Sequence, residues 1–262
     1  GASFRNEIYD AYKANRDEPP EDLAAQFPLI REAVRAFGLT PIEQEGYEAD
    51  DLIATYVAQA RDTGAEITIV SGDKDLMQII GERVSMYDPM PGNERRIGHD
   101  EVIKKFGVGP DKVVEVQALA GDSTDNIPGV PGIGVKTAAQ LVEQFGDVET
   151  LLERADEIKQ NKRRENLIEY AEQARISRKL VELDSDVPLA HPLDDLNLPE
   201  IDGEKLIAFC KAMEFTTLTK RVADAFDLDI DRIEADERFA PDGGEGENDE
   251  DATDGPPGPV QL

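Results

Sequence analysis

The sequence predicts an α/β fold, in which a parallel sheet flanked by helices is followed by a wholly helical region. Three observations predict this. Helical and strand-like patterns alternate up to about residue 95, as in parallel α/β sheets. Beyond Gly98 the apolar spacing is helical, with glycine and proline between segments. The end of the chain is acidic and low in apolar residues, which predicts a disordered linker. We therefore expect three parts, residues 1–95, 96–225 and 226–262.

The composition excludes several classes of protein. The 262 residues are enough for a sizeable core, and no run approaches the ~18 apolar residues of a membrane helix. The first residues lack the basic and apolar pattern of a signal peptide. A single cysteine, Cys210, excludes a disulfide framework, fits a reducing cytoplasm and is expected in the core. We expect a cytoplasmic protein with no membrane partner.

The charge is strongly negative but unevenly distributed. There are 28 basic and 57 acidic residues, a net charge of −29, which taken whole argues against a nucleic-acid partner. Much of the excess lies beyond Asp224, whereas Lys159, Lys162, Arg163 and Arg164 form a basic cluster in the middle of the chain. The overall charge therefore does not decide what any one surface binds.

Two helices are predicted before the first strand. Leu23–Phe37 has apolar residues on one face and stops at Gly38, and Pro28 inside it marks a kink or a fresh start. Glu48–Arg61 is a second amphipathic helix that opens with acidic residues.

Two strands enclose a third helical segment. Glu66–Val70 is short and β-branched, and it ends at Ser71-Gly72. Lys74–Ile80 is predicted to be helical, and Val84–Tyr87 is the next strand. The carboxyl ends of such strands form the ligand crevice of open parallel sheets.

Three groups of acidic residues stand out by their context. The first pair directly follows the first strand, the second group opens the helix at residue 48, and the third lies between a helix and a glycine- and proline-rich loop. In that order they are Asp73 and Asp75; Glu48, Asp50 and Asp51; and Asp122 and Asp125. Taken singly, several of them fit helix N-caps equally well, and that alternative stays open.

Carboxylates brought together repel one another unless a cation neutralises them. Oxygen ligands without histidine or cysteine nearby favour Mg²⁺ or Mn²⁺. Two such ions can hold the attacking and leaving oxygens of a phosphodiester. The acidic groups therefore predict a divalent-metal site for phosphoryl chemistry.

A glycine-rich run precedes a predicted helix over Val135–Phe145. Glycines such as Gly132 and Gly134 let the backbone approach a ligand, and free amides at a helix start bind phosphate. Lys136 would reinforce this contact. A tight connection is the plain alternative, but the run fits a helix-hairpin-helix grip on a DNA backbone. It lacks the ending of a nucleotide-binding P-loop.

The opening segment mixes basic and aromatic residues at helical spacing. Such residues can stack on bases and hold the phosphates of a single strand. A solvated amphipathic helix explains the spacing equally well. The candidate residues are Arg5, Tyr9, Tyr12, Lys13 and Arg16.

Four segments carry a family resemblance. They are FRNEIYDAYKANR, GYEADDLIATYV, SGDKDLMQ and GDSTDNIPGVPGIGVKTAAQL, and they occur in this order. Together they resemble the 5′→3′ exonuclease domains found at the start of bacterial type I DNA polymerases, a branch of the flap endonuclease or 5′ nuclease family. The resemblance runs from residue 4 to about residue 225.

The resemblance implies a PIN-like sheet and a metal-dependent nuclease that cuts 5′ flaps, nicked or forked duplexes and RNA primers on DNA, in replication and excision repair. It implies two Mg²⁺ or Mn²⁺ ions, a monomer, and a chain continuous with polymerase domains. All seven acidic residues above match its metal ligands. Lys13 and Arg16 match catalytic residues of its helical arch. The hairpin Gly129–Ala139, with Thr137, matches its duplex clamp, where a K⁺ ion can bridge the loop to phosphate.

One departure from the family concerns the start of the chain. The family begins with a strand bearing an aspartate and carries another aspartate just before the Phe4-Arg5 segment, so two ligands would precede Gly1. We therefore expect an N-terminally truncated fragment with weak metal binding and little or no cleavage, whose acidic linker leads to polymerase domains.

Three other functions are compatible with parts of the sequence. A stand-alone 5′ nuclease is disfavoured by the acidic linker. A non-catalytic DNA-binding fragment that acts through the hairpin alone remains an alternative. A calcium-binding protein is disfavoured because no Asp-x-Asp-x-Asp-Gly loop is present.

Overall fold

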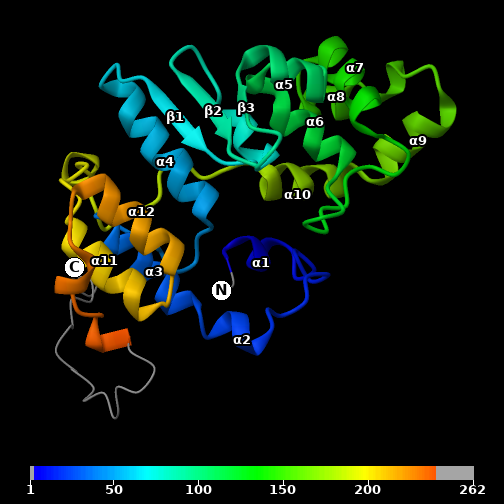
Figure 1. Ribbon diagram of the computed structural model, residues 1–262. Coiled ribbons are helices and arrows are strands. Elements are labelled where there is room, and N and C mark those ends of the chain that lie inside the picture. Colours follow the sequence, from blue (N-terminus) through cyan, green and yellow to red (C-terminus); the bar gives the residue numbers. More distant parts are fainter. Residues whose placement is uncertain (1–2, 240–262) are drawn as a thin grey trace, which may run out of the picture. The chain divides into compact units, whose positions relative to one another are not determined.

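The computed structural model describes residues 3–239, which form two compact units (Figure 1). One unit contains the chain up to Glu18 together with Glu43–Leu189, and the other contains Pro19–Ile42 and the chain from Ala190 onward. Each unit has its own hydrophobic core. The core of the first unit contains residues from both sides of position 95. The boundary predicted at that position is therefore a change of secondary structure within one unit.

The first unit contains a three-stranded mixed sheet in the order β1-β2-β3. Strand β1 (Ile67–Val70) runs parallel to β2 (Val84–Asp88), as predicted. Strand β3 (Arg95–Ile97) runs antiparallel to β2, so the prediction of a purely parallel sheet is wrong. Because β3 has three residues and two of them are exposed arginines, it has no apolar alternation from which to predict a strand.

Two helical segments next to β1 begin at acidic residues. Helix α4 (Ala49–Asp62) starts with a capping box formed by Glu48 and Asp51, and Figure 1 shows it beside β1. After β1 the chain forms a 3₁₀ helix, η1 (Lys74–Ile79), where the sequence predicted an ordinary helix. The Asp73 side chain accepts the Asp75 N–H at 3.0 Å and caps η1. Both acidic groups are thus held by local backbone geometry.

Six helices follow β3 in the first unit, among residues 99–181. Helix α6 is apolar nearly all round, with Val113, Val116 and Leu119 fully buried, because it packs between α7 and α10. The helices are α5 (His99–Phe106), α6 (Val113–Ala120), α7 (Val135–Phe145), α8 (Val148–Glu153), α9 (Asn161–Glu169) and α10 (Ala171–Val181), with short 3₁₀ turns at Pro110–Lys112 and Ala155–Glu157. The predicted helix over Val135–Phe145 is confirmed.

The opening segment is largely turns instead of the predicted helix. Only α1 (Arg5–Ile8) is helical, and Lys13 has a left-handed φ of 55°. The Lys13 N–H donates to the Asp125 carbonyl at 2.9 Å, and the Asn126 side chain donates to the Ala11 carbonyl at 2.6 Å. These bonds to a loop more than 100 residues away replace the bonds of a helix.

The second unit consists of helices around a small core. Helices α2 (Glu21–Ala24) and α3 (Phe27–Ala36) divide the predicted Leu23–Phe37 helix, and Pro28 in the first turn of α3 confirms a fresh start. The later helices are α11 (Gly203–Ala212) and α12 (Thr216–Phe226), with 3₁₀ turns at Leu193–Asp195, Ile230–Arg232 and Glu237–Phe239. Cys210 is buried in this core, as expected.

Part of the predicted disordered tail has a defined structure. Phe239 meets Phe209 edge to face, with ring centroids 5.7 Å apart, so the prediction is wrong for residues 226–239. The rest of the predicted tail, residues 240–262, lies outside the described residues. Within residues 3–239, no helix is long and apolar enough to cross a membrane.

We predict that the cap of α8 contributes measurably to stability. Asp147 accepts the Thr150 N–H at 2.7 Å, and this bond lowers the pKa of Asp147. Asp147→Ala should reduce the free energy of unfolding by about 1 kcal/mol at pH 7, measured by urea denaturation. The pKa of Asp147 is lower in the folded chain than in the unfolded chain. The stability difference between the wild type and Asp147→Ala should therefore be fully present above the usual aspartate pKa and disappear as the pH falls through the folded pKa.

The matched control is Glu153→Ala, on the exposed C-terminal end of the same helix. It should change the free energy of unfolding by less than about 0.5 kcal/mol. Equal effects of the two substitutions would contradict the assignment of Asp147 as a cap.

Candidate active site

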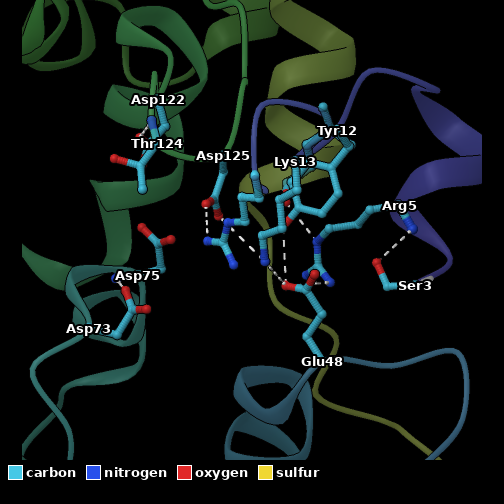
Figure 2. A network of polar contacts seen from close by, with 12 residues as sticks. Ser3, Arg5, Tyr12, Lys13, Glu48, Asp73, Asp75, Asp122, Thr124 and Asp125 are labelled. Atoms are coloured by element: carbon cyan, nitrogen blue, oxygen red, sulfur yellow. Dashed lines mark hydrogen bonds and ion pairs between the residues drawn. The ribbon is translucent and has the colours of Figure 1, made fainter. Parts of the chain in front are cut away.

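Carboxylates from three parts of the first unit meet beyond the carboxyl end of β1 (Figure 2). Asp73 and Asp75 follow β1 directly, and Glu48 precedes α4. Asp122 and Asp125 lie in the loop after α6, which is closed because the Asp122 and Ile127 backbones exchange bonds of 2.8 and 2.7 Å. The structure therefore brings the three predicted acidic groups into one network.

Like-charge repulsion is evident at Asp50. Burial raises the pKa of Asp50 to about 7, together with the negative charges of Asp73, Asp75 and Glu48. Burial also raises the pKa of Asp75. The pKa of a carboxyl group rises in this way when the group is buried and other carboxylates surround it. Groups with such shifted pKa values are concentrated at functional sites. The cluster therefore attracts cations.

The chain's own cations lie among these carboxylates. Lys13 Nζ is 2.7 Å from Glu48 Oε2 and 3.6 Å from Asp125 Oδ2, and Arg16 Nη2 is 2.5 Å from Asp125 Oδ1. Within residues 3–239, no three histidine, cysteine or acidic residues form a ready-made metal site. The Lys13 ammonium and the Arg16 guanidinium thus occupy positions next to carboxylates that the sequence predicts as metal ligands.

Lys74 is a functional candidate that the sequence analysis missed. Its ammonium contacts the Asp122 carboxylate and lies 3.6 Å from Asp75 Oδ1. Burial acts to raise the pKa of Asp122, but the bonds from Lys74 and from the Thr124 N–H lower it below the usual value. A lysine directly between Asp73 and Asp75 in the sequence was the available signal.

Asp51 has a structural role in place of the predicted metal ligation. Its side chain is fully buried, and its oxygens accept bonds of 2.7 and 2.8 Å from the Arg5 guanidinium. The backbone N–H groups of Glu48 and Asp184 donate to the same carboxylate. Burial acts to raise the pKa of Asp51, but these donors lower it. Both oxygens are thus already used by the protein.

Two residues predicted to hold DNA are instead buried. Arg5 is 1% exposed, and its Nε donates to the Leu180 carbonyl at 2.8 Å. Tyr12 is 4% exposed and donates to Glu48 Oε2 at 3.1 Å, and burial together with the Glu48 charge raises its pKa. The prediction that they contact bases or phosphates is wrong, because neither side chain reaches solvent. Tyr9 packs partly buried against the core of the first unit.

Gly129 also has a structural role. It has a φ of 59°, and a β-carbon there would lie 2.4 Å from the backbone nitrogen of Gly121. Its N–H donates to Ser177 Oγ at 3.1 Å in the interior. The prediction that Gly129 contacts DNA is therefore wrong: it allows two loops to touch.

The remaining hairpin residues face solvent. Gly132, Gly134 and Lys136 are exposed, and Thr137 is half-buried. The first bonds of α7 run from the Thr137 and Ala138 N–H groups to the Gly134 carbonyl, so the amides just before them are not used within the helix. This is the arrangement that binds an anion.

A basic helix adjoins this hairpin. The Asn166 side chain on α9 donates to the Pro131 carbonyl at 2.7 Å, which joins α9 to the loop. Lys159, just before α9, and Lys162, in its first turn, are exposed. The predicted basic cluster and the predicted phosphate-binding turn therefore belong to one surface region.

Two family descriptions match the chain, one after the other. Residues 1–107 match the 5′-3′ exonuclease N-terminal resolvase-like domain. Residues 108–204 match the 5′-3′ exonuclease C-terminal SAM fold. The first match contains the sheet and most of the acidic residues, and the second contains the hairpin.

Among curated proteins, the chain is 60% identical over 232 residues to DNA polymerase I of Rhizobium leguminosarum, which covers 88% of the chain and 23% of that protein. It is 40% identical over 222 residues to DNA polymerase I of Bacillus caldotenax, which covers 84% of the chain and 25% of that protein. The chain thus spans about a quarter of the length of these relatives.

Solved structures share the fold. The T5 D15 protein co-crystallised with metal ions matches with a TM-score of 0.61 at 23% identity, over 86% of this chain and 80% of that one. The catalytic core of Rad2 in complex with DNA matches with a TM-score of 0.56 at 16% identity, over 86% and 77% of the two chains. These likenesses concern the fold alone.

We predict that Asp51 and Asp73 respond oppositely to neutralisation. Asp51→Asn should lower the free energy of unfolding by about 3–5 kcal/mol, because it leaves the buried Arg5 charge without a partner. Asp73→Asn removes an exposed charge from a repelling group and should leave stability within about 0.5 kcal/mol or raise it. Urea denaturation at pH 7 measures both. A similar loss for the two variants would contradict the distinction.

We predict that two hairpin glycines have separable roles. Gly129→Ala should lower the free energy of unfolding by at least about 3 kcal/mol, because its β-carbon would overlap the Gly121 backbone at a positive φ. Gly134→Val meets open space, so it should keep the fold but weaken binding to duplex DNA several-fold. Thermal unfolding and fluorescence anisotropy at fixed salt distinguish the two. Unchanged duplex affinity of folded Gly134→Val would remove the hairpin from the DNA interface.

Proposed function

Because the chain belongs to the 5′-3′ exonuclease family, we propose that it acts as a metal-dependent 5′ nuclease on DNA flaps, nicks and forked duplexes. One observation carries the proposal: six acidic side chains and three cations meet beyond β1, where open sheets bind ligands. The acidic residues are Glu48, Asp50, Asp73, Asp75, Asp122 and Asp125, and the cations are Lys13, Arg16 and Lys74.

The donor set fits divalent metal ions. All six side chains are hard oxygen ligands, and burial together with the neighbouring negative charges raises the pKa of Asp50. A bound cation would neutralise those charges. The ammonium groups of Lys13 and Lys74 already bridge pairs of these carboxylates. The carboxylates therefore already lie where a positive charge can contact two of them at once. We propose that these six residues hold Mg²⁺ or Mn²⁺, in two sites, and that Asp51 does not. When bound, the ions would activate water and stabilise charge on the scissile phosphate.

Lys13 and Arg16 are proposed to bind the scissile phosphate. Each cation contacts one oxygen of the Asp125 carboxylate, and Arg16 keeps about half of its side chain exposed. A phosphate that approaches the acidic cluster requires compensating positive charge close by, and these side chains provide it. Their present ion pairs hold them next to the carboxylates until substrate arrives.

The hairpin is proposed to hold the duplex. The exposed turn at Gly132 and Gly134, with Lys136 and Thr137 beyond it, offers amides and a positive charge to a backbone phosphate. Lys162 on the adjoining helix adds positive charge beside it. A K⁺ ion between this loop and phosphate stays a prediction. Binding of this kind depends on salt and not on sequence.

The relatives suggest the biological setting. Because they are bacterial DNA polymerases I and the chain matches about a quarter of their length, we propose that it is continuous with polymerase domains. Its substrates would then be RNA primers and damaged strands in replication and excision repair, at the nucleoid in the cytoplasm, where the chain would act as a monomer.

A second function remains a candidate: a non-catalytic DNA-binding module. The observation in its favour is that, among residues 3–239, the acidic side chains do not form a ready-made metal site. In that case the hairpin alone would provide the activity of the chain, and the cluster beyond β1 would remain paired with lysine and arginine.

We predict that the chain cleaves a 5′-flap oligonucleotide at a measurable rate. The cleavage should require Mg²⁺, and EDTA should abolish it. Loss of a hydrogen bond to a metal ligand typically lowers activity ~10–100-fold, and loss of the ligand itself should cost more. Asp73→Asn should therefore lower the cleavage rate by more than ~100-fold, while flap binding in EDTA stays unchanged. Asp100→Asn, exposed on α5, serves as the control and should cleave normally. Binding without cleavage in either Mg²⁺ or Mn²⁺ would favour the DNA-binding module.

A further inference from the structure

Gln117 is a buried amide that contacts the acidic cluster. It lies on α6 with 3% of its surface exposed, and its Nε2 donates to Asp75 Oδ1 at 2.6 Å. Its neighbours along the helix, Val116 and Ala118, are fully buried. The amide therefore extends from the core of the first unit directly to one of the proposed metal ligands.

The other half of this amide has no partner. Among the residues that the structure describes, Gln117 Oε1 is the buried side-chain nitrogen or oxygen that lacks a hydrogen bond. A half-satisfied amide in a core is unfavourable compared with an apolar side chain of the same shape. Stability alone therefore does not explain a glutamine at this position, whereas its bond to Asp75 does.

The two partners of the Asp75 carboxylate differ in rigidity. Lys74 lies 3.6 Å away, is one-third exposed and also contacts Asp122. Gln117 is enclosed on a buried helix, and α6 packs against η1. Both contacts are made with Oδ1, so neither of them uses Oδ2 of this carboxylate. A cation that binds Oδ2 would therefore leave the Gln117 bond in place.

We propose that Gln117 is a positioning residue, which orients the Asp75 carboxylate so that its other oxygen can bind a divalent metal ion. This inference rests on the proposed function above. A hydrogen bond to a ligating carboxylate removes its freedom to rotate, and loss of such contacts typically weakens metal binding about 10–100-fold. Gln117 itself touches neither metal nor substrate.

The test is Gln117→Met in the full chain, because methionine keeps the length of the side chain and removes the donor. Mn²⁺ affinity is measured without DNA by electron paramagnetic resonance of the free ion, and stability by thermal unfolding in EDTA. We expect Mn²⁺ affinity to fall at least about tenfold while the unfolding temperature stays the same or rises. A purely structural glutamine would lower the unfolding temperature and leave Mn²⁺ affinity unchanged, which would overturn the proposal.

Gln78→Met is the matched control. The Gln78 amide bonds to backbone groups of Val181, Leu183 and Asp75 at 2.9–3.1 Å, and does not contact the Asp75 carboxylate. It should lower the unfolding temperature and leave Mn²⁺ affinity nearly unchanged. An equal loss of Mn²⁺ affinity in both variants would mean that any disturbance near η1 weakens the site, and would overturn a specific role for Gln117.

Two further measurements complete the design. Gln117→Asn keeps the amide but shortens the side chain, so it should reproduce the loss of Mn²⁺ affinity, and wild-type affinity in this variant would contradict the proposal. In flap cleavage, Gln117→Met should require more Mg²⁺ to reach the wild-type plateau rate. If the wild-type chain binds no Mn²⁺, the proposed metal site fails and this inference with it. If the wild type and Gln117→Met bind Mn²⁺ equally, only the role of Gln117 fails.

Discussion

The buried ion pair between Arg5 and Asp51 holds the candidate site together. Two bonds of 2.7 and 2.8 Å join the opening segment to the start of α4, and Arg5 also donates to the Leu180 and Glu182 carbonyls at the C-terminal end of α10. Three distant parts of the chain thus converge on one guanidinium. A buried pair of this kind is costly to break, because either partner alone leaves an uncompensated charge.

This pair allows the fold to keep mutually repelling carboxylates close together. With the opening segment fixed, Lys13 lies against Glu48 and Asp125, and on the other side Lys74 lies against Asp122. Burial and the neighbouring carboxylates raise the pKa of Asp50, and the positive charge of Lys13 opposes that rise. If metal and phosphate bind here as proposed, they would take the place of positive charges that the chain itself supplies.

The acidic loop and the hairpin are also physically connected. Gly121 and Gly129 touch through their backbones, and the Val130 N–H donates to the Leu119 carbonyl at 2.8 Å. Asp122 follows Gly121 directly, so the segment that bears a proposed ligand and the turn proposed to bind duplex are parts of one closed loop. A duplex bound at the hairpin, as proposed, would therefore lie at a fixed distance from the acidic cluster, as positioning of a substrate for cleavage requires.

Local patterns in the sequence determined the strands β1 and β2, helices α4 and α7, and the three acidic groups, because apolar spacing and capping residues act over a few positions. Only the tertiary structure decided which role each of two adjacent residues has. Adjacent aspartates lie on different faces of α4, so Asp51 meets Arg5 while Asp50 faces the cluster. The burial of Arg5 and Tyr12, the turns around Lys13 and the bond from Gln117 depend on partners 35 to 175 residues away, which no local pattern records.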